Sequence, residues 1–283
     1  MVTGKRSSKA FKGAYIALVL AFLYIPIVVM IALSFNSSVS RAEWTGFTLD
    51  WYVKLFQTKR IMAALRVTLE VAALATVAST IIGTLGAIGM HSMKKRWANL
   101  LVNVSYLPMT TPDIVTGVSL MLMFVFIRFP VIKFIQENGN NQMVLDWVKL
   151  PLGKWTMLLA HIAFDTPYVL FSVMPKLRQM NPNLYEAALD LGCHPFKALW
   201  KVIIPEIAPG IVTGALLAFT MSLDDFVISY FTSISDQNLA MIVYSSARRG
   251  VEPTMYALST LMFVAIMALL LIVNRRNGLE NVS

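Results

Sequence analysis

The sequence predicts an all-α membrane protein with six transmembrane helices, arranged as a single transmembrane domain over residues 1–283. Of these residues 57% are hydrophobic and only 14% are charged, which leaves too little polar surface for a soluble globule. Apolar runs at least as long as the roughly 20 residues of a spanning helix recur along the chain. Lys and Arg lie in short clusters beside these runs and not on one stripe, so the formal charge of +9 does not indicate nucleic-acid binding.

Three spans are expected in the first half of the chain. Residues 14–34 follow a basic segment that we expect to stay in the cytoplasm, which makes this span an uncleaved anchor in the lipid bilayer. Residues 71–90 are free of charge and rich in small residues, which suit close helix packing. Residues 98–127 are long enough for a third span, although two prolines and Asp113 interrupt it.

Three further spans are expected in the second half, at residues 155–175, 207–233 and 254–273. A segment of mixed charge, residues 176–206, separates the fourth span from the fifth and is expected to form a cytoplasmic loop. Six spans place both termini in the cytoplasm. A weak excess of Lys and Arg on the inner segments agrees with that orientation.

The cytoplasmic segment has the pattern of two short helices. The first has an apolar face whose members recur at i, i+3, i+4 and i+7, namely Leu184, Ala187, Ala188 and Leu191. It starts either at Asn181, with Pro182 as the first helical residue, or at Asn183, with Glu186 completing a capping box. Gly192 is expected to end it, because glycine takes a positive φ without strain.

Pro195 permits a second helix, and Pro205 is expected to close it. The apolar residues of this second helix are Phe196, Leu199, Trp200 and Ile203. By pattern alone, two such helices fit equally an amphipathic loop that lies on the lipid headgroups.

Particular residues in this segment resemble the EAA signature of ABC importer permeases, E-A-A-x3-G-x9-I-x-L-P. The matching residues are Glu186, Ala187, Ala188, Gly192, Val202, Ile204 and Pro205, with apolar replacements at 202 and 204. Residues 35–38, 112–117 and 222–225 look like stretches of the permease subunits of bacterial spermidine/putrescine importers, the PotC-like branch.

That resemblance implies a type I ABC importer permease fold whose EAA loop forms a coupling helix against a separate ATPase. The residues expected to couple to the ATPase are Glu186, Ala187, Ala188, Asp190, Gly192 and Pro205. The resemblance also implies a second permease subunit in a heterodimer, two ATPase subunits and an external substrate-binding protein. It implies a location in the bacterial cytoplasmic membrane.

ATP chemistry is expected on the partner ATPase. The sequence contains no G-x-x-x-x-G-K-[ST] loop to cradle phosphates, so ATP and Mg²⁺ are assigned to that partner and no cofactor or metal to this chain. A single cysteine, Cys193, excludes an internal disulfide and a Cys-based metal site. We therefore expect a translocation subunit that is not itself an enzyme.

Aspartates inside the predicted spans indicate what is transported. They are Asp113, Asp165, Asp224 and Asp225. An ionised carboxylate near a helix centre costs about 3 kcal/mol on insertion scales, so these groups are expected to face a bundle interior, a wet cavity or a cation. No intramembrane Lys or Arg matches them, which points to a cationic substrate or to counter-charges on a second subunit.

Individual roles differ among these carboxylates. Asp113 follows a proline and Asp165 lies two residues before one, so each is expected to cap a restarted half-helix, to line the translocation route, or both. At 100° per residue, Asp224 and Asp225 lie on nearly opposite stripes of the fifth helix. We therefore expect Asp224 to line the pathway and Asp225 to be satisfied by a neighbouring helix.

Aromatic residues lie within a turn of these carboxylates. Polyamines carry several ammonium groups separated by alkyl segments, so a route for them needs spaced carboxylates with aromatic faces between. Tyr168 and Phe226 are the aromatic residues assigned to the substrate pathway, together with the four aspartates. His161, a lone histidine, is expected to be a hydrogen-bonded packing residue.

The function expected is import of a polyamine, spermidine or putrescine, by alternating access driven by the ATPase. Within the same architecture the alternative cargo is another small cation, a metal chelate or an oxyanion. A stand-alone secondary transporter is a remote alternative, because it does not explain the presence of the EAA loop. An intramembrane aspartyl protease is disfavoured because Asp224 and Asp225 point apart and the sequence has no G-x-G-D stretch.

Overall fold

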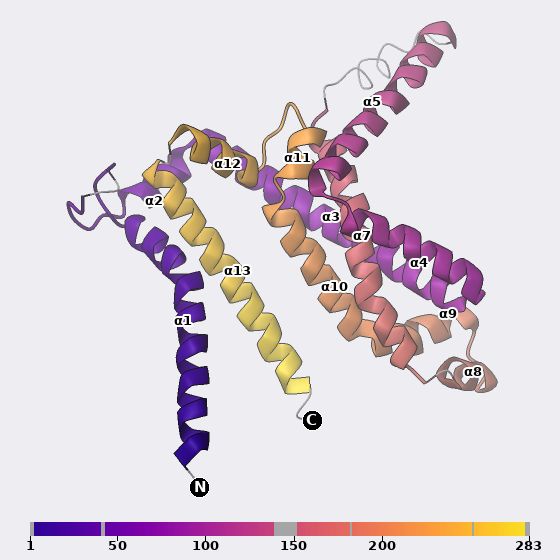
Figure 1. Ribbon diagram of the computed structural model, residues 1–283. Helices are drawn as coiled ribbons and strands as arrows, with labels where there is room; N and C mark the ends of the chain where they lie inside the picture. Colours follow the sequence, from indigo (N-terminus) through magenta and orange to yellow (C-terminus); the bar gives the residue numbers. More distant parts are fainter. Residues whose placement is uncertain (1–2, 41–42, 139–151, 182, 251, 281–283) are drawn as a thin grey trace. The chain divides into compact units, whose positions relative to one another are not determined.

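A computed structural model describes residues 3–40, 43–138, 152–181, 183–250 and 252–280. Within these ranges the regular structure is helical, apart from one isolated β-bridge between Asn36 and Phe47. The chain divides into two compact units, residues 1–62 with 245–283, and residues 63–244. Figure 1 shows the helices in chain order.

The first unit consists of long apolar helices and a short connecting one. α1 (Thr3–Leu33) and α13 (Pro253–Glu280) pack against each other, and α13 also packs against α2 (Asp50–Gln57). The apolar part of α1, Lys12–Leu33, is long enough to cross a bilayer, and none of its most apolar window is buried within the chain. Such a surface suits lipid or another subunit.

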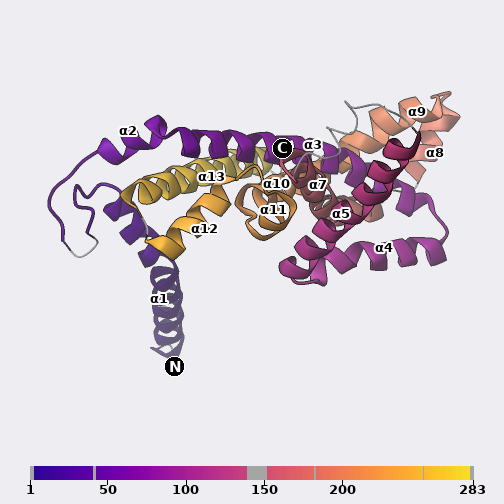
Figure 2. The same ribbon diagram turned by 90° about the horizontal axis from the view of Figure 1, so that it is seen from above.

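The second unit is built around α7. Its helices, in chain order, are α3 (Lys59–Ser92, from Ala63 onward), α4 (Lys95–Thr110), α5 (Asp113–Asn138), α7 (Lys154–Gln179), α8 (Asn183–Asp190), α9 (Pro195–Ala198), the π-helical turn η1 (Leu199–Ile203), α10 (Ile204–Asp224), α11 (Val227–Thr232) and α12 (Leu239–Arg249, up to Tyr244). α7 contacts α4, α5, α10 and α11. Figure 2 shows it among these neighbours from above.

Glycines let two helices approach α7 closely. A Cβ atom on Gly214 of α10 would lie 2.9 Å from the Cα of Val169, and one on Gly83 of α3 would lie 2.9 Å from the carbonyl oxygen of Thr166. Real side chains do not tolerate such distances, so these positions need glycine. This agrees with the close helix packing that the small residues of α3 predict.

The start of α7 is bonded to the end of α11 and to the segment that follows it. The backbone N–H of Lys154 donates to Asp236 Oδ2 over 2.9 Å, and Thr156 Oγ1 donates to the carbonyl oxygen of Thr232 over 2.6 Å. The ammonium of Lys154 also forms an ion pair with Glu70 of α3. The end of the α7 bundle opposite α8 is therefore held by polar bonds.

Five described helical stretches are long and apolar enough to cross a membrane. They are Lys12–Leu33, Lys59–Ser92, Asp113–Pro130, Lys154–Gln179 and Pro195–Asp224. The last predicted span, 254–273, falls on α13, whose described apolar stretch is Pro253–Ala268. A multi-pass all-α membrane protein is confirmed, and the count of six spans stays a prediction.

The third expected span, 98–127, is not one helix. α4 ends at Thr110 and α5 begins at Asp113, with Thr111 in an extended conformation (φ −83°, ψ 138°). Pro112 explains the break, because a residue before proline is pushed out of the helical region and proline itself has no N–H to continue the helix. Only α5 is apolar enough to be a candidate span in this part of the chain.

The fifth expected span, 207–233, is also broken. α10 ends at Asp224, Asp225 is extended, and α11 restarts at Val227. The Asp225 carboxylate accepts hydrogen bonds from the backbone N–H groups of Ile228 and Ser229, at 3.2 and 2.8 Å. These bonds satisfy donors that a new helix start leaves open, so Asp225 stabilises the break.

Candidate functional site

The first helix of the segment 176–206, α8, forms where the sequence predicts it. Asn181 Oδ1 accepts the backbone N–H of Asn183 over 3.0 Å, which favours a start at Asn181 over the capping box; residue 182 lies outside the described residues. At the other end Gly192 has φ +79°. Its N–H donates to the carbonyl of Leu189 and that of Cys193 to Ala188, the pair of bonds of a Schellman motif.

Pro205 does not close the second helix, contrary to expectation. α9 starts at Pro195, and the chain continues through η1 into α10 without interruption, with Pro205 in the first turn of α10. The N–H of Ile204 donates to the carbonyl of Leu199, a wider π-type bond. Such a turn lets the helix accommodate a proline, which lacks an N–H and crowds the preceding carbonyls.

This segment is anchored to the bundle by apolar contacts. Ile203 of η1 and Ile207 of α10 are buried in one cluster with Val173 and Leu177 of α7. Tyr185 of α8 packs against the same cluster. α8 is therefore in apolar contact with the cluster that α7 and α10 form.

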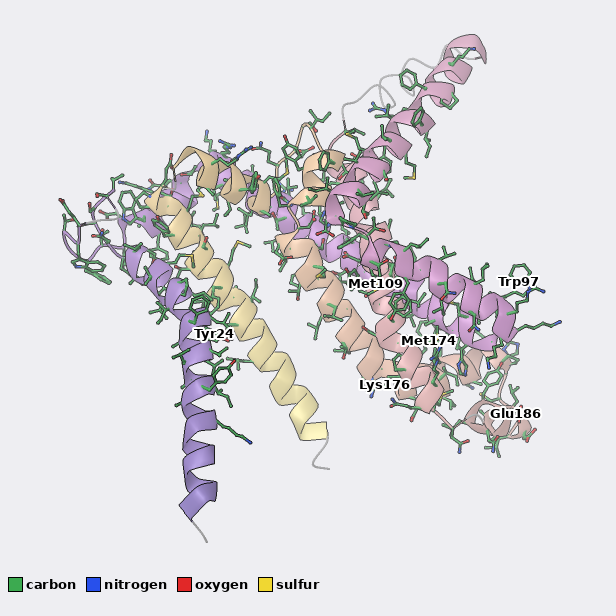
Figure 3. All side chains as sticks on the ribbon, in the orientation of Figure 1. Tyr24, Trp97, Met109, Met174, Lys176 and Glu186 are labelled. Atoms are coloured by element: carbon green, nitrogen blue, oxygen red, sulfur yellow. The ribbon has the colours of Figure 1, made fainter. Side chains whose placement is uncertain are left out.

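The outer surface of the segment is exposed. Glu186, Ala187 and Asp190 are exposed and Ala188 is half-buried; Figure 3 labels Glu186 on α8. Leu191 is 89% exposed. Exposed side chains of both charged and apolar kinds suit a protein partner better than water alone.

Among the aspartates of the predicted spans, Asp224 and Asp225 have opposite surroundings. Asp224, the last residue of α10, is exposed. The side chain of Asp225 is 9% exposed, and besides capping α11 it accepts from Ser229 Oγ at 2.9 Å. Asp225 is satisfied by its surroundings, but the two aspartates do not lie on opposite stripes of one helix, because α10 ends at Asp224. A pathway role for Asp224 remains a prediction.

A polar network surrounds Asp225. His161 Nδ1 lies 2.6 Å from Ser222 Oγ, and His161 Nε2 lies 2.9 Å from Ser229 Oγ and 3.4 Å from Asp225 Oδ2. Asn238 Nδ2 donates to Ser229 Oγ and to the carbonyl of Asp225, both over 2.8 Å. His161 is 2% exposed, so the expectation of a hydrogen-bonded packing histidine is confirmed.

Asp113 and Asp165 also differ. Asp113 is exposed in the first turn of α5, directly after the break at Pro112, where the N-terminal end of a helix favours negative charge. Asp165 is completely buried, and neither of its carboxylate oxygens has a hydrogen-bond partner among the described residues. Asp165 therefore does not cap a restarted half-helix, because α7 continues past Pro167 to Gln179.

The predicted pathway aromatics take part in packing. The ring of Tyr168 lies 5.4 Å from that of Phe164, and both belong to an apolar cluster that includes Ile228 of α11. Phe226, in the break between α10 and α11, stacks on Tyr244 at 4.0 Å. Both residues keep partly accessible surface beside the aspartates, and their contact with a substrate stays a prediction.

Comparison with known proteins places this arrangement in a family. The sequence model of the family described as binding-protein-dependent transport system inner membrane component matches residues 79–277 of this chain. The chain belongs to this family. Its members form the membrane-spanning part of importers, so the chain is a permease subunit and not an enzyme.

Relatives of this permease match over most of their length. The chain is 33% identical over 271 residues to the spermidine/putrescine transport system permease protein PotC of Haemophilus influenzae, covering 94% of this chain and 97% of the relative. It is 36% identical over 247 residues to the putrescine transport system permease protein PotI of Escherichia coli K12, covering 87% and 83%.

Solved structures confirm the fold class. A bacterial ABC transporter involved in the import of the acidic polysaccharide alginate matches with a TM-score of 0.67 at 16% identity, over 99% of this chain and 97% of that one. The bacterial alginate ABC transporter in complex with alginate pentasaccharide-bound periplasmic protein matches with a TM-score of 0.65 at 17% identity, over 95% and 93%. At these identities the likeness concerns the fold of the permease alone.

Sequence reasoning missed several polar residues of the permease. Asn238 joins Asp225 and Ser229 although it lies outside the predicted fifth span, 207–233, and only the polar residues on either side of the break hint at it. Thr80 and Thr84 of α3 have buried hydroxyls without partners among the described residues. The signal available for them was the occurrence of hydroxyl residues at i and i+4 in an otherwise apolar span.

Proposed function

We propose that this permease imports polyamines, spermidine or putrescine, by alternating access in a complex driven by a separate ATPase. One observation supports a polyamine as the cargo: relatives matching 87–94% of this chain are named as putrescine or spermidine/putrescine permeases. The exposed carboxylates of Asp113 and Asp224 suit a cationic cargo. Tyr168 and Phe226 lie beside such carboxylates and supply aromatic faces for ammonium groups.

The complex that we propose has four further proteins around this chain. They are a second permease subunit, two ATPase subunits and an external substrate-binding protein. The exposed apolar surface of α1 and α5 suits lipid or the second permease. ATP and Mg²⁺ bind to the ATPase subunits, and both termini of this chain lie in the cytoplasm.

Coupling in this proposal follows the apolar contacts of the cytoplasmic segment. Closure of the ATPase pair displaces α8, whose exposed residues Glu186 and Asp190 face the ATPase. Because Tyr185 and Ile203 pack in the same cluster as Val173 and Leu177, the displacement reaches α7 and α10. These helices carry Asp165 and Asp224, so their movement changes the exposure of the proposed route.

The test is uptake into vesicles that hold the reconstituted complex. Labelled putrescine and spermidine are supplied outside with the binding protein, and ATP is supplied on the side of the ATPase. We expect ATP-dependent accumulation of at least one of the two and none of a neutral sugar or of an oxyanion such as sulfate. Accumulation of sulfate without polyamine would reassign the cargo.

A further inference from the structure

Three buried polar groups in the second unit lack partners among the described residues. They are the carboxylate of Asp165 on α7 and the hydroxyls of Thr80 and Thr84 on α3. Buried polar atoms in proteins are almost always hydrogen-bonded, to the chain, to water or to a bound ion. A group of three such exceptions needs a common explanation.

The hydroxyls of Thr80 and Thr84 differ from those of other helical threonines. The usual bond of such a hydroxyl goes to the carbonyl four residues earlier, and it is present at Thr68, Thr76, Thr166, Thr213, Thr220, Thr232 and Thr260. Thr80 and Thr84 make no such bond. Their oxygen atoms are therefore available to a ligand inside the bundle.

The register of α3 and α7 brings these groups to one level. Val71 and Ala75 pack with Met157 and Leu158, whereas Ala87 packs with Leu170 and Val173, so the two helices run in the same direction. Between these contacts Gly83 meets Thr166 and Val169. Thr80 is three residues before Gly83, and Asp165 is about three residues before the middle of the Thr166–Val169 contact, so Thr80 lies at about the level of Asp165.

The three groups also turn to the same side. At about 100° per residue, Thr80 and Thr84 lie about 60° and about 100° round α3 from Gly83, in one rotational sense. Asp165 lies about 70° round α7 from the middle of the contact with Gly83, in the opposite sense. The two helices are parallel and face each other, so a rotation in one sense on α3 and in the opposite sense on α7 leads to the same side of the pair. Thr80 and Thr84 on α3 and Asp165 on α7 therefore point into one groove between the helices.

α10 covers this groove without supplying a donor. Ser222 of α10 bonds His161 of α7, and Gly214 meets Val169, so the α10 residue at the level of Asp165 is Ala218. Ala218 is fully buried and presents only a methyl group. The nearest histidine on α7, His161, is already bonded to Ser222 and Ser229.

From this placement we propose that Asp165, Thr80 and Thr84 form a buried site for one monovalent cation. Its oxygen donors suit an alkali ion, and they suit equally the terminal ammonium of an amine, which offers three N–H donors. A carboxylate taken out of water is either protonated or paired with positive charge, and among the described residues no Lys or Arg pairs with Asp165. The site is distinct from the exposed Asp113 and Asp224 and is internal to this subunit.

Thermal unfolding of the full-length chain in detergent tests the proposal. The midpoint is measured in choline chloride, in NaCl or KCl of equal ionic strength, and in choline chloride with putrescine. We expect an alkali ion, putrescine or both to raise the midpoint by on the order of 5 °C, the effect of near-saturating binding. A rise with alkali ions identifies a free ion as ligand, and a rise with putrescine alone identifies an amine.

Variants assign the effect to the groove. Asp165→Asn and the Thr80→Val, Thr84→Val double variant are expected to lose the rise. Thr76→Val is the matched control, because it removes the same hydroxyl one turn earlier on α3 where that hydroxyl bonds Ala72. The proposal is overturned by a midpoint that no cation changes, or by a rise that survives in Asp165→Asn. The thermal midpoint does not depend on transport, so failure of the cation-site proposal can be distinguished from failure of polyamine import.

Discussion

At the scale of single residues, identical side chains have different roles because their surroundings differ. Asp224 and Asp225 are adjacent, yet one is exposed and the other caps α11 and contacts His161. Truncating a cap costs about 1 kcal/mol, and leaving buried partners unsatisfied costs a further 1–3 kcal/mol. Their replacements are therefore expected to have different consequences.

Asp224→Asn is expected to lower polyamine uptake at least tenfold while leaving the assembled complex intact, because the exposed carboxylate has no structural bond to lose among the described contacts. Asp225→Ala is expected to lower the thermal midpoint and the yield of complex, because it removes the α11 cap and a partner of His161. Uptake and size-exclusion profiles measure the two effects. Equal loss of complex in both variants would make Asp224 structural.

Gly192 offers a second prediction at this scale. Its φ of +79° is strained for a side chain with a Cβ, although a Cβ there would meet nothing within 4 Å. Gly192→Val is therefore expected to disturb the end of α8 and uncouple ATP hydrolysis from uptake. Gly192→Asn should retain more coupling, because asparagine tolerates this conformation. The ratio of amine imported to ATP hydrolysed measures this coupling, and equal ratios in both variants would contradict a conformational role for Gly192.

At the scale of helices, the packing of α10 on α7 depends on small residues. Gly214→Leu is expected to separate the helices, because the added atoms overlap the backbone at Val169. Overpacking of this kind costs typically 1–3 kcal/mol. The thermal midpoint in detergent should fall by several degrees. Gly89→Leu on α3 is the control, since a Cβ there meets nothing within 4 Å, and an equal fall in both would argue against close packing.

Local signals in the sequence predicted most helices and the start and end of α8. Long apolar runs predicted the spans, and Gly192 and Pro195 predicted the turn between α8 and α9. Pro205 misled because a π-type turn absorbs a proline that usually ends a helix. The break after Asp224 was missed because helical periodicity does not reveal the local caps that the Asp225 carboxylate provides for Ile228 and Ser229. The bond from Asn238 to the carbonyl of Asp225 depends on the tertiary structure, which the sequence pattern does not encode.

At the scale of the whole molecule, the chain is a membrane-spanning subunit, and the exposed surface of α8, at one end of α7 and α10, is the coupling surface that we propose. Apolar side chains join that surface to the helices that carry Asp165 and Asp224. The proposed placement of Thr80 at the level of Asp165 was not evident from sequence, because it is inferred from how Gly83 packs α3 on α7. Family membership and fold are shown, and cargo and coupling are the parts to be measured.

The most direct measurement of the central claim is ATP-driven uptake of labelled putrescine and spermidine by vesicles holding the complete complex, compared between the wild-type chain and Glu186→Lys. Glu186 is exposed on α8, and reversing its charge is expected to leave assembly in the membrane unchanged. We predict that the wild-type complex accumulates polyamine and that the variant hydrolyses ATP with at least tenfold less uptake. Unchanged uptake in Glu186→Lys, or no ATP-dependent polyamine uptake by the wild-type complex, would contradict the account.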